Sequence, residues 1–355
     1  MKKNSIPSMQ GSVCPVPLQH SEKIVLGHGS GGKMMNDLIR NIFLPPLDNP
    51  TLSAGDDAGI VHPNYCTQLA ISTDSHVVYP LFYPGGDIGK LAVCGTVNDV
   101  AMMGAIPQYL TAGFILEEGL DIDILVQVVE SMKDASREAG VQIIAGDTKV
   151  VEKGKADGLY ITTAGIGIAT LGLSIGGAQA KPGDLVILSG PIGDHGIAVL
   201  GARGELGFDS DIKSDVAPLN HLIAAMLDVS NEIHVLRDPT RGGVASSLNE
   251  IAVQSNVGIT IFEDAIPVRP AVQAACEMLG FDALDIANEG KLLALVSEQD
   301  SQVILDQMHN TKYGEEAVII GEVNSSPAGR VLMKTAIGST RVVDFLAGEI
   351  LPRIC

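Results

Sequence analysis

The chain has 355 residues, of which 46% are hydrophobic and 40 are glycine, and its formal net charge is −19 at pH 7. This composition is typical of a compact enzyme with about two domains and excludes a largely disordered chain. The negative charge disfavours nucleic acid and anionic membrane as partners, and no apolar run approaches the length that spans a bilayer.

Residues 1–21 are expected to form a disordered leader, because they contain two lysines but no apolar core of the kind found in signal peptides. The five cysteines include no CxxC pair, so neither a disulfide framework nor a zinc site is indicated. These observations predict a cytoplasmic protein.

A glycine-rich loop at 27–33 follows a strand predicted at 24–26. Two of its glycines and its lysine match the P-loop pattern, but Met34 stands where a P-loop has the hydroxyl residue that binds magnesium. The loop therefore either closes over phosphates or is only the turn before a helix predicted at 34–43. As a phosphate cover it would use Gly29, Gly31, Gly32 and Lys33. The helix is expected to end at the prolines that follow it, Pro45, Pro46 and Pro50.

Aspartates then recur on four separate parts of the chain, each at the end of an element or beside glycine. They are Asp56 and Asp57 in a turn, Asp74 after a strand predicted at 68–73, Asp99 next to Asn98 in a helix predicted at 86–103, and Asp147 after a strand predicted at 141–145. Each alone suits a helix cap or a turn. Because gathered carboxylates repel each other without a cation, together they predict a shared site for Mg²⁺ and phosphate.

Further periodic segments complete the first half of the chain. A strand is predicted at 109–116, a helix at 124–139 that Gly140 closes, and a long strand at 159–169. We interpret Cys94 as a small core residue and not as a nucleophile. The glycine-rich break at 172–183 is the candidate domain boundary.

The second half carries three further candidates on a mixture of strands and helices. His195, in a loop after a predicted strand, is either a base or a structural or solvent-facing residue. Arg241 stands just before a predicted helix, where backbone donors suit a phosphate or carboxylate; in the alternative interpretation, Asp238 or Thr240 only caps that helix. Glu289 lies beside a glycine and before a buried-looking strand, so it is expected to point into a site.

The chain ends in Ile-Leu-Pro-Arg-Ile-Cys. Pro352 disfavours helix, which predicts an extended arm that reaches roughly 25 Å from Gly348. Taken alone, this tail suits either an end that packs on a neighbour or a carrier whose Cys355 thiol is the working group.

Eight stretches in this order resemble the HypE family of the PurM-like, or aminoimidazole-ribonucleotide-synthetase-like, ATPase superfamily. They are Gly-His-Gly-Ser-Gly-Gly at 27–32, Gly-Asp-Asp-Ala at 55–58, Ser-Thr-Asp at 72–74, Gly-Thr-Val-Asn-Asp-Val-Ala at 95–101, Gly-Asp-Thr-Lys at 146–149, Asp-Pro-Thr-Arg-Gly-Gly at 238–243, Asn-Glu-Gly at 288–290, and the terminal Pro-Arg-Ile-Cys. The acid motifs indicate the superfamily, whereas the fifth and last stretches select HypE. The resemblance covers about residues 22–355.

The resemblance implies a two-domain PurM-like fold of the α/β (α+β) class. It divides the chain into an N-terminal ATP-binding and dimerisation domain at 22–171, a C-terminal domain at 172–340, and a strand with a flexible carrier tail at 341–355. The N-terminal domains of a homodimer would pair into a shared barrel.

The resemblance also implies an activity in the maturation of [NiFe]-hydrogenase. A HypF-type carbamoyltransferase would load a carbamoyl group onto Cys355, and the chain would use ATP to dehydrate this thiocarbamate to a thiocyanate. The cyano group would then pass to iron held by a HypC–HypD complex.

The implied chemistry assigns roles to the candidate residues. Those that hold metal and phosphate are Asp56, Asp74, Asp99 and Asp147, with Asp57, Asn98, Thr148 and Arg241 in support. Lys149 and Glu289 are the candidates for orienting the thiocarbamate and taking its proton. A glutamate base would need a pKa raised by burial.

Two other enzymes of the superfamily and one non-catalytic function are the alternatives. A selenophosphate synthetase would want a cysteine or selenocysteine in the loop 27–33, which has none. A thiamine-monophosphate kinase would have no use for a terminal thiol, and a scaffold for hydrogenase assembly would not need the full set of acids.

Overall fold

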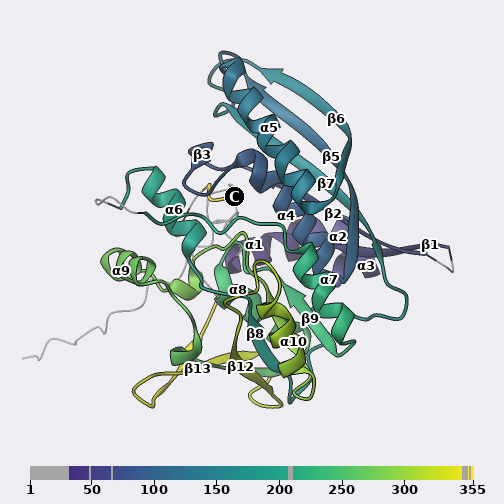
Figure 1. The fold of residues 1–355 in the computed structure, drawn as a ribbon, viewed down its shortest axis with the longest axis vertical. Helices are drawn as coiled ribbons and strands as arrows, with labels where there is room; N and C mark the ends of the chain where they lie inside the picture. The colour runs from purple at the N-terminus through teal and green to yellow at the C-terminus, as the bar shows by residue number, and fades with distance from the viewer. Residues whose placement is uncertain (1–31, 48, 65–66, 207–210, 346–350, 352) are drawn as a thin grey trace, which may run out of the picture.

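The computed structural model describes residues 32–47, 49–64, 67–206, 211–345, 351 and 353–355. Two mixed α/β halves are each built on one large sheet, and the C-terminus lies between them (Figure 1). Several predictions fall outside the described residues: the leader 1–21, the strand 24–26, the loop residues Gly29 and Gly31, and the start of the predicted arm, including Gly348 and Pro352.

Among the described residues, the first sheet has five strands, and helices cover one of its faces. Its strands, in spatial order, are β1 (Gly59–Asn64), β2 (Thr67–His76), β7 (Leu159–Ala169), β5 (Ala105–Glu117) and β6 (Gln142–Val151). Only β5 and β6 pair in parallel. Buried and exposed positions alternate along β7, as expected of a strand with one covered face.

Helices α4 (Ile88–Met102) and α5 (Ile122–Ala139), both of which were predicted as helices, pack on that face. Helix α4 is apolar all round and almost fully buried, and Asp87 caps it by accepting the Gly89 N–H over 2.7 Å. Helix α5 is amphipathic and ends at Gly140, which takes the left-handed conformation at φ 72°.

The second sheet has seven strands within the ranges that the structure describes. In spatial order they are β14 (Thr340–Val343), β13 (Arg330–Lys334), β10 (Gly258–Phe262), β12 (Val318–Asn324), β8 (Leu185–Leu188), β11 (Leu293–Val296) and β9 (Ile233–Arg237). The helices of this half are α6 (Asp194–Ala202), α7 (Asn220–Val229), α8 (Gly243–Gln254), α9 (Pro270–Leu279) and α10 (Ser301–His309). Every residue of β11 is buried, because core clusters lie on both faces of this sheet.

Short elements connect these layers. They are β3 (Phe82–Tyr83), β4 (Gly86–Asp87) and the 3₁₀ turns η3 (Glu263–Ala265) and η4 (Ala283–Asp285). Across the ranges that the structure describes, no helix is long and apolar enough to cross a membrane.

The prediction that three prolines end the first helix was wrong. The chain continues through α1 (Lys33–Leu38), the π-helical turn η2 (Ile39–Phe43) and α2 (Leu44–Leu47), which contains the first two prolines. The third proline is the first residue of α3 (Pro50–Ser53). A proline is tolerated in a first helical turn because its missing N–H would have no intrahelical partner there.

Two strands run further than predicted. Strand β2 continues to His76 and β6 to Val151, so Asp74 and Asp147 lie inside strands and not after them. The extra residues are held by pairing across the sheet, since His76 lies opposite Ile161 and Val151 opposite Glu117. Such long-range pairing outweighs the local preference of glycine and aspartate for turns.

Candidate active site

Four acidic side chains gather where the two halves meet. Asp57 lies in the turn before β1, Asp74 in β2 and Asp99 in α4, while Asp238 follows β9 directly. Gly95 of α4 lets the strand approach, because a Cβ at this glycine would lie 3.3 Å from Asp74 Oδ2. The turn, the strand and the helix of the first half thus face the end of a strand of the second.

These acids perturb one another. Burial raises the pKa of Asp99 well above its usual range, and the charges of Asp238 and Asp74 raise it further. Burial also raises the pKa of Asp57, although Arg237, whose guanidinium lies 3.0 Å from Asp57 Oδ1, opposes the shift. Burial raises the pKa of Asp238 to about 6. The cluster therefore resists full ionisation unless positive charge is supplied.

The acids fit a hard divalent cation that a phosphate ligand also helps to hold. Among the residues described, no three histidine, cysteine, aspartate or glutamate side chains are arranged to hold a metal by themselves. Magnesium commonly takes one or two carboxylates and completes its shell with water and substrate phosphates. A set of four carboxylates that do not surround a metal by themselves suits that mode of binding.

The neighbouring acids Asp56 and Asp57 differ from their predicted roles, in which Asp56 was a metal ligand and Asp57 only supported the site. Asp56 Oδ1 accepts the backbone N–H of Gly177 over 2.7 Å, so Asp56 ties the first half to the start of the second. Asp57 is the member of the pair that joins the buried cluster. A one-residue step in a glycine-flanked turn reverses which carboxylate points inward, and sequence spacing does not determine that choice.

Asn98, predicted to support the cofactor, is occupied elsewhere. Its Oδ1 accepts the Leu219 N–H over 2.8 Å, and its Nδ2 donates to the Ala217 carbonyl over 3.1 Å. The side chain is 2% exposed. Asn98 therefore satisfies backbone groups of the segment before α7. These two hydrogen bonds explain how a polar side chain can be buried in an apolar helix without binding a ligand.

Within one chain, Asp147 does not join the other acids. Strand register places it in one row with Ser75, three strands away, which corresponds to about 14 Å. Ser75 points away from the helices, whereas its neighbour Asp74 faces α4. Asp147 is exposed and pairs with Lys149 over 2.6 Å, and Thr148 between them is exposed as well.

Of the glycine-rich loop, the structure describes only its last two residues. Gly32 is buried and precedes α1, and Lys33 is the exposed first residue of that helix.

The end of the chain lies inside the site. The Val77 N–H donates to the Cys355 carbonyl over 3.0 Å, and the Tyr79 N–H donates to the Arg353 carbonyl over 3.3 Å. The tail was predicted to be extended, but Arg353 takes the left-handed conformation at φ 56° and turns it. Its guanidinium pairs with Asp157.

The thiol of Cys355 lies among ionisable groups. Burial raises its pKa strongly, Arg241 lowers it, and Glu289 and Asp74 raise it. Cys355 is also the largest cause of the raised pKa of Arg241. Cys94, by contrast, is fully buried in α4 with a pKa raised to about 12, which confirms its assignment to the core.

Glu289 has the environment that a base would need. It is 4% exposed, and its Oε1 has no hydrogen-bond partner among the described residues. Burial raises its pKa, Asp238 and Asp74 raise it further, and Arg241 opposes them. The raised pKa predicted as a requirement from sequence is thus present.

Two residues in and near this site, Asp238 and His195, have contacts that were not predicted from the sequence. Asp238 was considered only as a helix cap, although an acid directly after a buried strand could have marked it as a site residue. His195 is neither exposed nor in a loop: it is fully buried at the start of α6, and its Nε2 lies 2.8 Å from the Ile354 carbonyl. No local signal could reveal a partner 159 residues away.

Comparisons with known proteins agree with the fold. The N-terminal domain model of AIR synthase related proteins matches residues 55–169, and the C-terminal domain model matches 181–334. Carbamoyl dehydratase HypE of Cupriavidus necator is 52% identical over 335 residues, which cover 94% of this chain and 95% of that protein. Carbamoyl dehydratase HypE of Escherichia coli is 44% identical, covering 94% and 99%.

Solved structures of HypE proteins also resemble this chain. A HypE–HypF complex superposes with a TM-score of 0.83 at 50% identity, covering 87% of this chain and 99% of that one. Hydrogenase maturation protein HypE in complex with ATP gives a TM-score of 0.79 at 48% identity, covering 94% and 100%. Thiamine monophosphate kinase of Aquifex aeolicus, at 17% identity and a TM-score of 0.61, shares the fold alone. The predicted two-domain PurM-like fold is confirmed.

Proposed function

The chain belongs to the HypE family of carbamoyl dehydratases, and on this premise we propose that it uses ATP to dehydrate a carbamoyl group on its own Cys355. The observation that supports this most is the placement of the chain end: Cys355 is hydrogen-bonded to Val77, directly after β2, and its thiol is close enough to Arg241, Glu289 and Asp74 for their charges to shift its pKa. An ATP site that receives the end of its own chain suits an enzyme whose substrate is attached there.

The proposed reaction converts a poor leaving group into a good one. The amide oxygen of the thiocarbamate accepts the terminal phosphoryl group of ATP, and ADP leaves. Loss of the two N–H protons and cleavage of the C–O bond then release phosphate and leave a thiocyanate on sulfur. Phosphoryl transfer depends mainly on positioning and charge neutralisation, so this site needs ligands for charge more than a nucleophile of its own.

Each group in the site has a proposed part. Asp57, Asp74, Asp99 and Asp238 would hold Mg²⁺ together with the phosphates of ATP, and the ion would neutralise the phosphate charge. Lys33 and Arg241 would bind phosphate oxygens. Glu289, with its raised pKa and unpaired oxygen, would take a proton from the amide nitrogen.

The tail would be loaded in a different position from the one described. Attack on a carbamoyl donor needs the thiolate, and burial among acids raises the pKa of the Cys355 thiol. We therefore assign the docked tail to dehydration and an undocked tail to loading by a HypF-type carbamoyltransferase. The cyano group would afterwards pass to iron on a HypC–HypD complex, for [NiFe]-hydrogenase.

A homodimer would cover the open face of the first sheet. Ile71, Ile166 and Tyr109 lie in one row across β2, β7 and β5, and each is more than one-third exposed. Pairing two such faces would bury these side chains. Because Asp147 and Lys149 lie on the same face, the dimer would also bring them towards the partner's site, where Lys149 could orient the thiocarbamate.

The test is ADP formation by the full chain with a HypF-type partner, its carbamoyl donor and ATP. We expect Cys355→Ala to abolish the part of ADP formation that depends on the carbamoyl donor. Cys276→Ala, which alters a buried cysteine of α9, is the matched control and should retain it. Donor-dependent ADP formation that persists in Cys355→Ala would favour a kinase or synthetase of the same superfamily.

A further inference from the structure

Each of the last three residues accepts at least one hydrogen bond at its backbone carbonyl. Besides the bonds from Val77 and Tyr79, the Arg203 guanidinium donates to the Arg353 carbonyl over 2.6 Å, and His195 Nε2 contacts the Ile354 carbonyl. The backbone donors belong to the first half of the molecule, and the two side-chain donors belong to α6 and its C-terminal end in the second. The tail is therefore fastened to both halves within one residue of the thiol.

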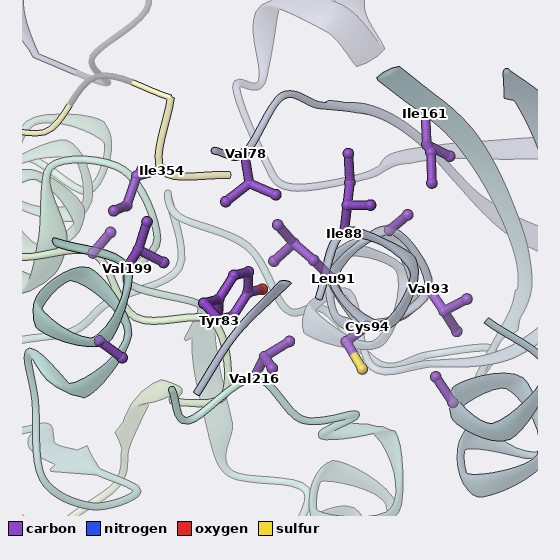
Figure 2. Close-up of a cluster of buried hydrophobic side chains, with 14 of the residues drawn as sticks. Val78, Tyr83, Ile88, Leu91, Val93, Cys94, Ile161, Val199, Val216 and Ile354 are labelled. Atoms are coloured by element: carbon purple, nitrogen blue, oxygen red, sulfur yellow. The ribbon is translucent and has the colours of Figure 1, made fainter. Parts of the chain in front are cut away.

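The tail makes apolar contacts in addition to these hydrogen bonds. Ile354 is 4% exposed and lies in the same buried cluster as Val199 of α6 and Tyr83, as Figure 2 shows. Gly196 of α6 leaves room for the tail, because a Cβ there would lie 2.9 Å from Leu351 Cδ1. Helix α6 thus forms a seat for the end of the chain.

The hydrogen-bond partners of His195 determine which of its two ring nitrogens carries the hydrogen. The Ile354 carbonyl can only accept, so Nε2 must carry the hydrogen. In the neutral ring Nδ1 is then an acceptor, and the Ser214 hydroxyl lies 2.8 Å away to donate to it. The Ser214 oxygen in turn accepts the Val216 N–H over 3.1 Å. Backbone, hydroxyl, imidazole and tail form one chain of donors and acceptors.

The surroundings of the ring keep it neutral. His195 is fully buried, and burial lowers its pKa. The charged groups that act on it are Asp215, which raises this pKa, and Arg203, which lowers it. The Tyr83 ring makes a T-shaped contact with the imidazole, with the ring centroids 5.5 Å apart. The imidazole is the one fully buried side-chain donor to the tail among the described residues, and without it the buried Ile354 carbonyl would lose that partner.

We propose that His195, oriented by Ser214, is a positioning residue that latches the tail in the docked pose, so that the group on Cys355 faces Arg241 and Glu289. It touches neither the thiol nor the acids and acts through the Ile354 carbonyl. The consequence for dehydration rests on the proposed function, whereas the latch itself does not.

The experiment compares three variants of the full chain. His195→Phe keeps a ring against Tyr83 but has no donor, and His195→Gln restores an N–H near the position of Nε2. Ser214→Ala removes the hydroxyl that fixes the tautomer, together with the acceptor of the Val216 N–H. His221→Phe, a change at an exposed histidine of α7, is the matched control.

The first measurement is the rate at which iodoacetamide alkylates Cys355, followed by mass spectrometry of the C-terminal peptide. We expect His195→Phe to raise this rate roughly tenfold, because a buried carbonyl left unpaired disfavours the docked pose by that order. Ser214→Ala should raise it less, and His195→Gln and His221→Phe should stay near the rate of the unaltered chain. Equal rates in His195→Phe and His195→Gln would overturn the latch, as would an unaltered rate in both His195→Phe and Ser214→Ala.

The second measurement is conversion of preloaded thiocarbamate to thiocyanate. It should slow in His195→Phe and recover in His195→Gln, while loading by the carbamoyltransferase stays unchanged or becomes faster. If the alkylation pattern appears but the unaltered chain never forms thiocyanate, the latch stands and the proposed function fails. If the unaltered chain forms thiocyanate and His195→Phe does so at the same rate, the positioning role is overturned while the function stands.

Discussion

At the scale of single residues, Asp238 provides the sharpest test of the acid cluster, because it joins the second half of the molecule to the site. Asp238→Asn keeps the shape of the side chain but removes a charge that binding of Mg²⁺ and phosphate would use. We expect ATP hydrolysis to fall roughly 100-fold or more. Since the change also removes a buried like charge, the unfolding temperature of the chain without ATP should not fall. Asp134→Asn, at an exposed position of α5, is the control and should leave both quantities unaltered.

His195 makes a separate prediction about pH. Burial lowers its folded-state pKa below the unfolded value of 6.5, so the folded chain excludes a proton that the unfolded chain accepts. Its contribution to stability is complete above that value and is lost as the pH falls towards the folded pKa. The unfolding temperature should therefore drop less in His195→Gln than in the unaltered chain between about pH 7.5 and about pH 5.5. Equal drops would contradict a neutral buried imidazole.

The identity of the acids could be predicted from sequence, but their individual directions could not. Asp74 and Asp99 were expected in the site and lie in the acid cluster with Asp57 and Asp238. Asp56 and Asp57 differ by one position in a turn, and only the contacts of the folded chain decide which of them faces Gly177. The role of Asn98 depends in the same way on backbone groups more than 100 residues away.

At the scale of elements, the site depends on the close packing of α4 against β2. Gly95 lies on the helix where a Cβ would meet Asp74 Oδ2 at 3.3 Å and the His76 ring at 3.2 Å. Gly95→Ala should therefore displace Asp74 and lower ATP hydrolysis roughly tenfold or more, since small misplacements of a positioned group are costly. Stability should change little, because alanine is the better helix former.

Gly201→Ala in α6 is the matched control for this change. Its Cβ would meet only the end of the Leu206 side chain, which can move aside. We expect it to keep full ATP hydrolysis. A Gly95→Ala variant that hydrolyses ATP as fast as Gly201→Ala would show that the spacing of α4 and β2 does not position Asp74.

The limits of α5 were easier to predict than the ends of strands β2 and β6, for a physical reason. Helix α5 repeats its apolar residues along a continuous stretch and ends at a glycine, so its limits are local properties. Strands β2 and β6 continue because partners elsewhere in the sheet hold them, and that information is not local. The same difference explains why Asp147 was expected after a strand and not on its exposed edge.

At the scale of the whole molecule, the open face of the first sheet predicts a homodimer. Ile168 lies on that face near the C-terminal end of β7, the central strand, opposite Leu69 of β2 and Ile106 of β5, and is 51% exposed. Ile168→Glu should convert a dimer into a monomer in sedimentation experiments, because a charge would have to be buried in the paired faces. Met278→Glu, at a position of α9 that is 69% exposed, should leave the dimer intact. A dimer that survives Ile168→Glu would mean that another surface mediates association.

The architecture of the molecule was predictable from its motifs, whereas the resting place of the tail was not. The order of glycine and acid motifs pointed to two PurM-like domains, and the comparisons confirm them. The tail sequence alone suited either an end packed on a neighbour or a carrier. Its turn at Arg353, and its seat against α6 and the segment after β2, arise from contacts that only the assembled halves provide.

The most direct test of the central claim is mass spectrometry of the C-terminal peptide. The full chain is incubated with a HypF-type carbamoyltransferase, its carbamoyl donor and either ATP or a non-hydrolysable analogue supplied after loading. We predict a thiocarbamate on Cys355 when the analogue is present and a thiocyanate on the same sulfur when ATP is present. A Cys355 that stays unmodified beside an active carbamoyltransferase, or a thiocarbamate that persists with ATP, would contradict the account.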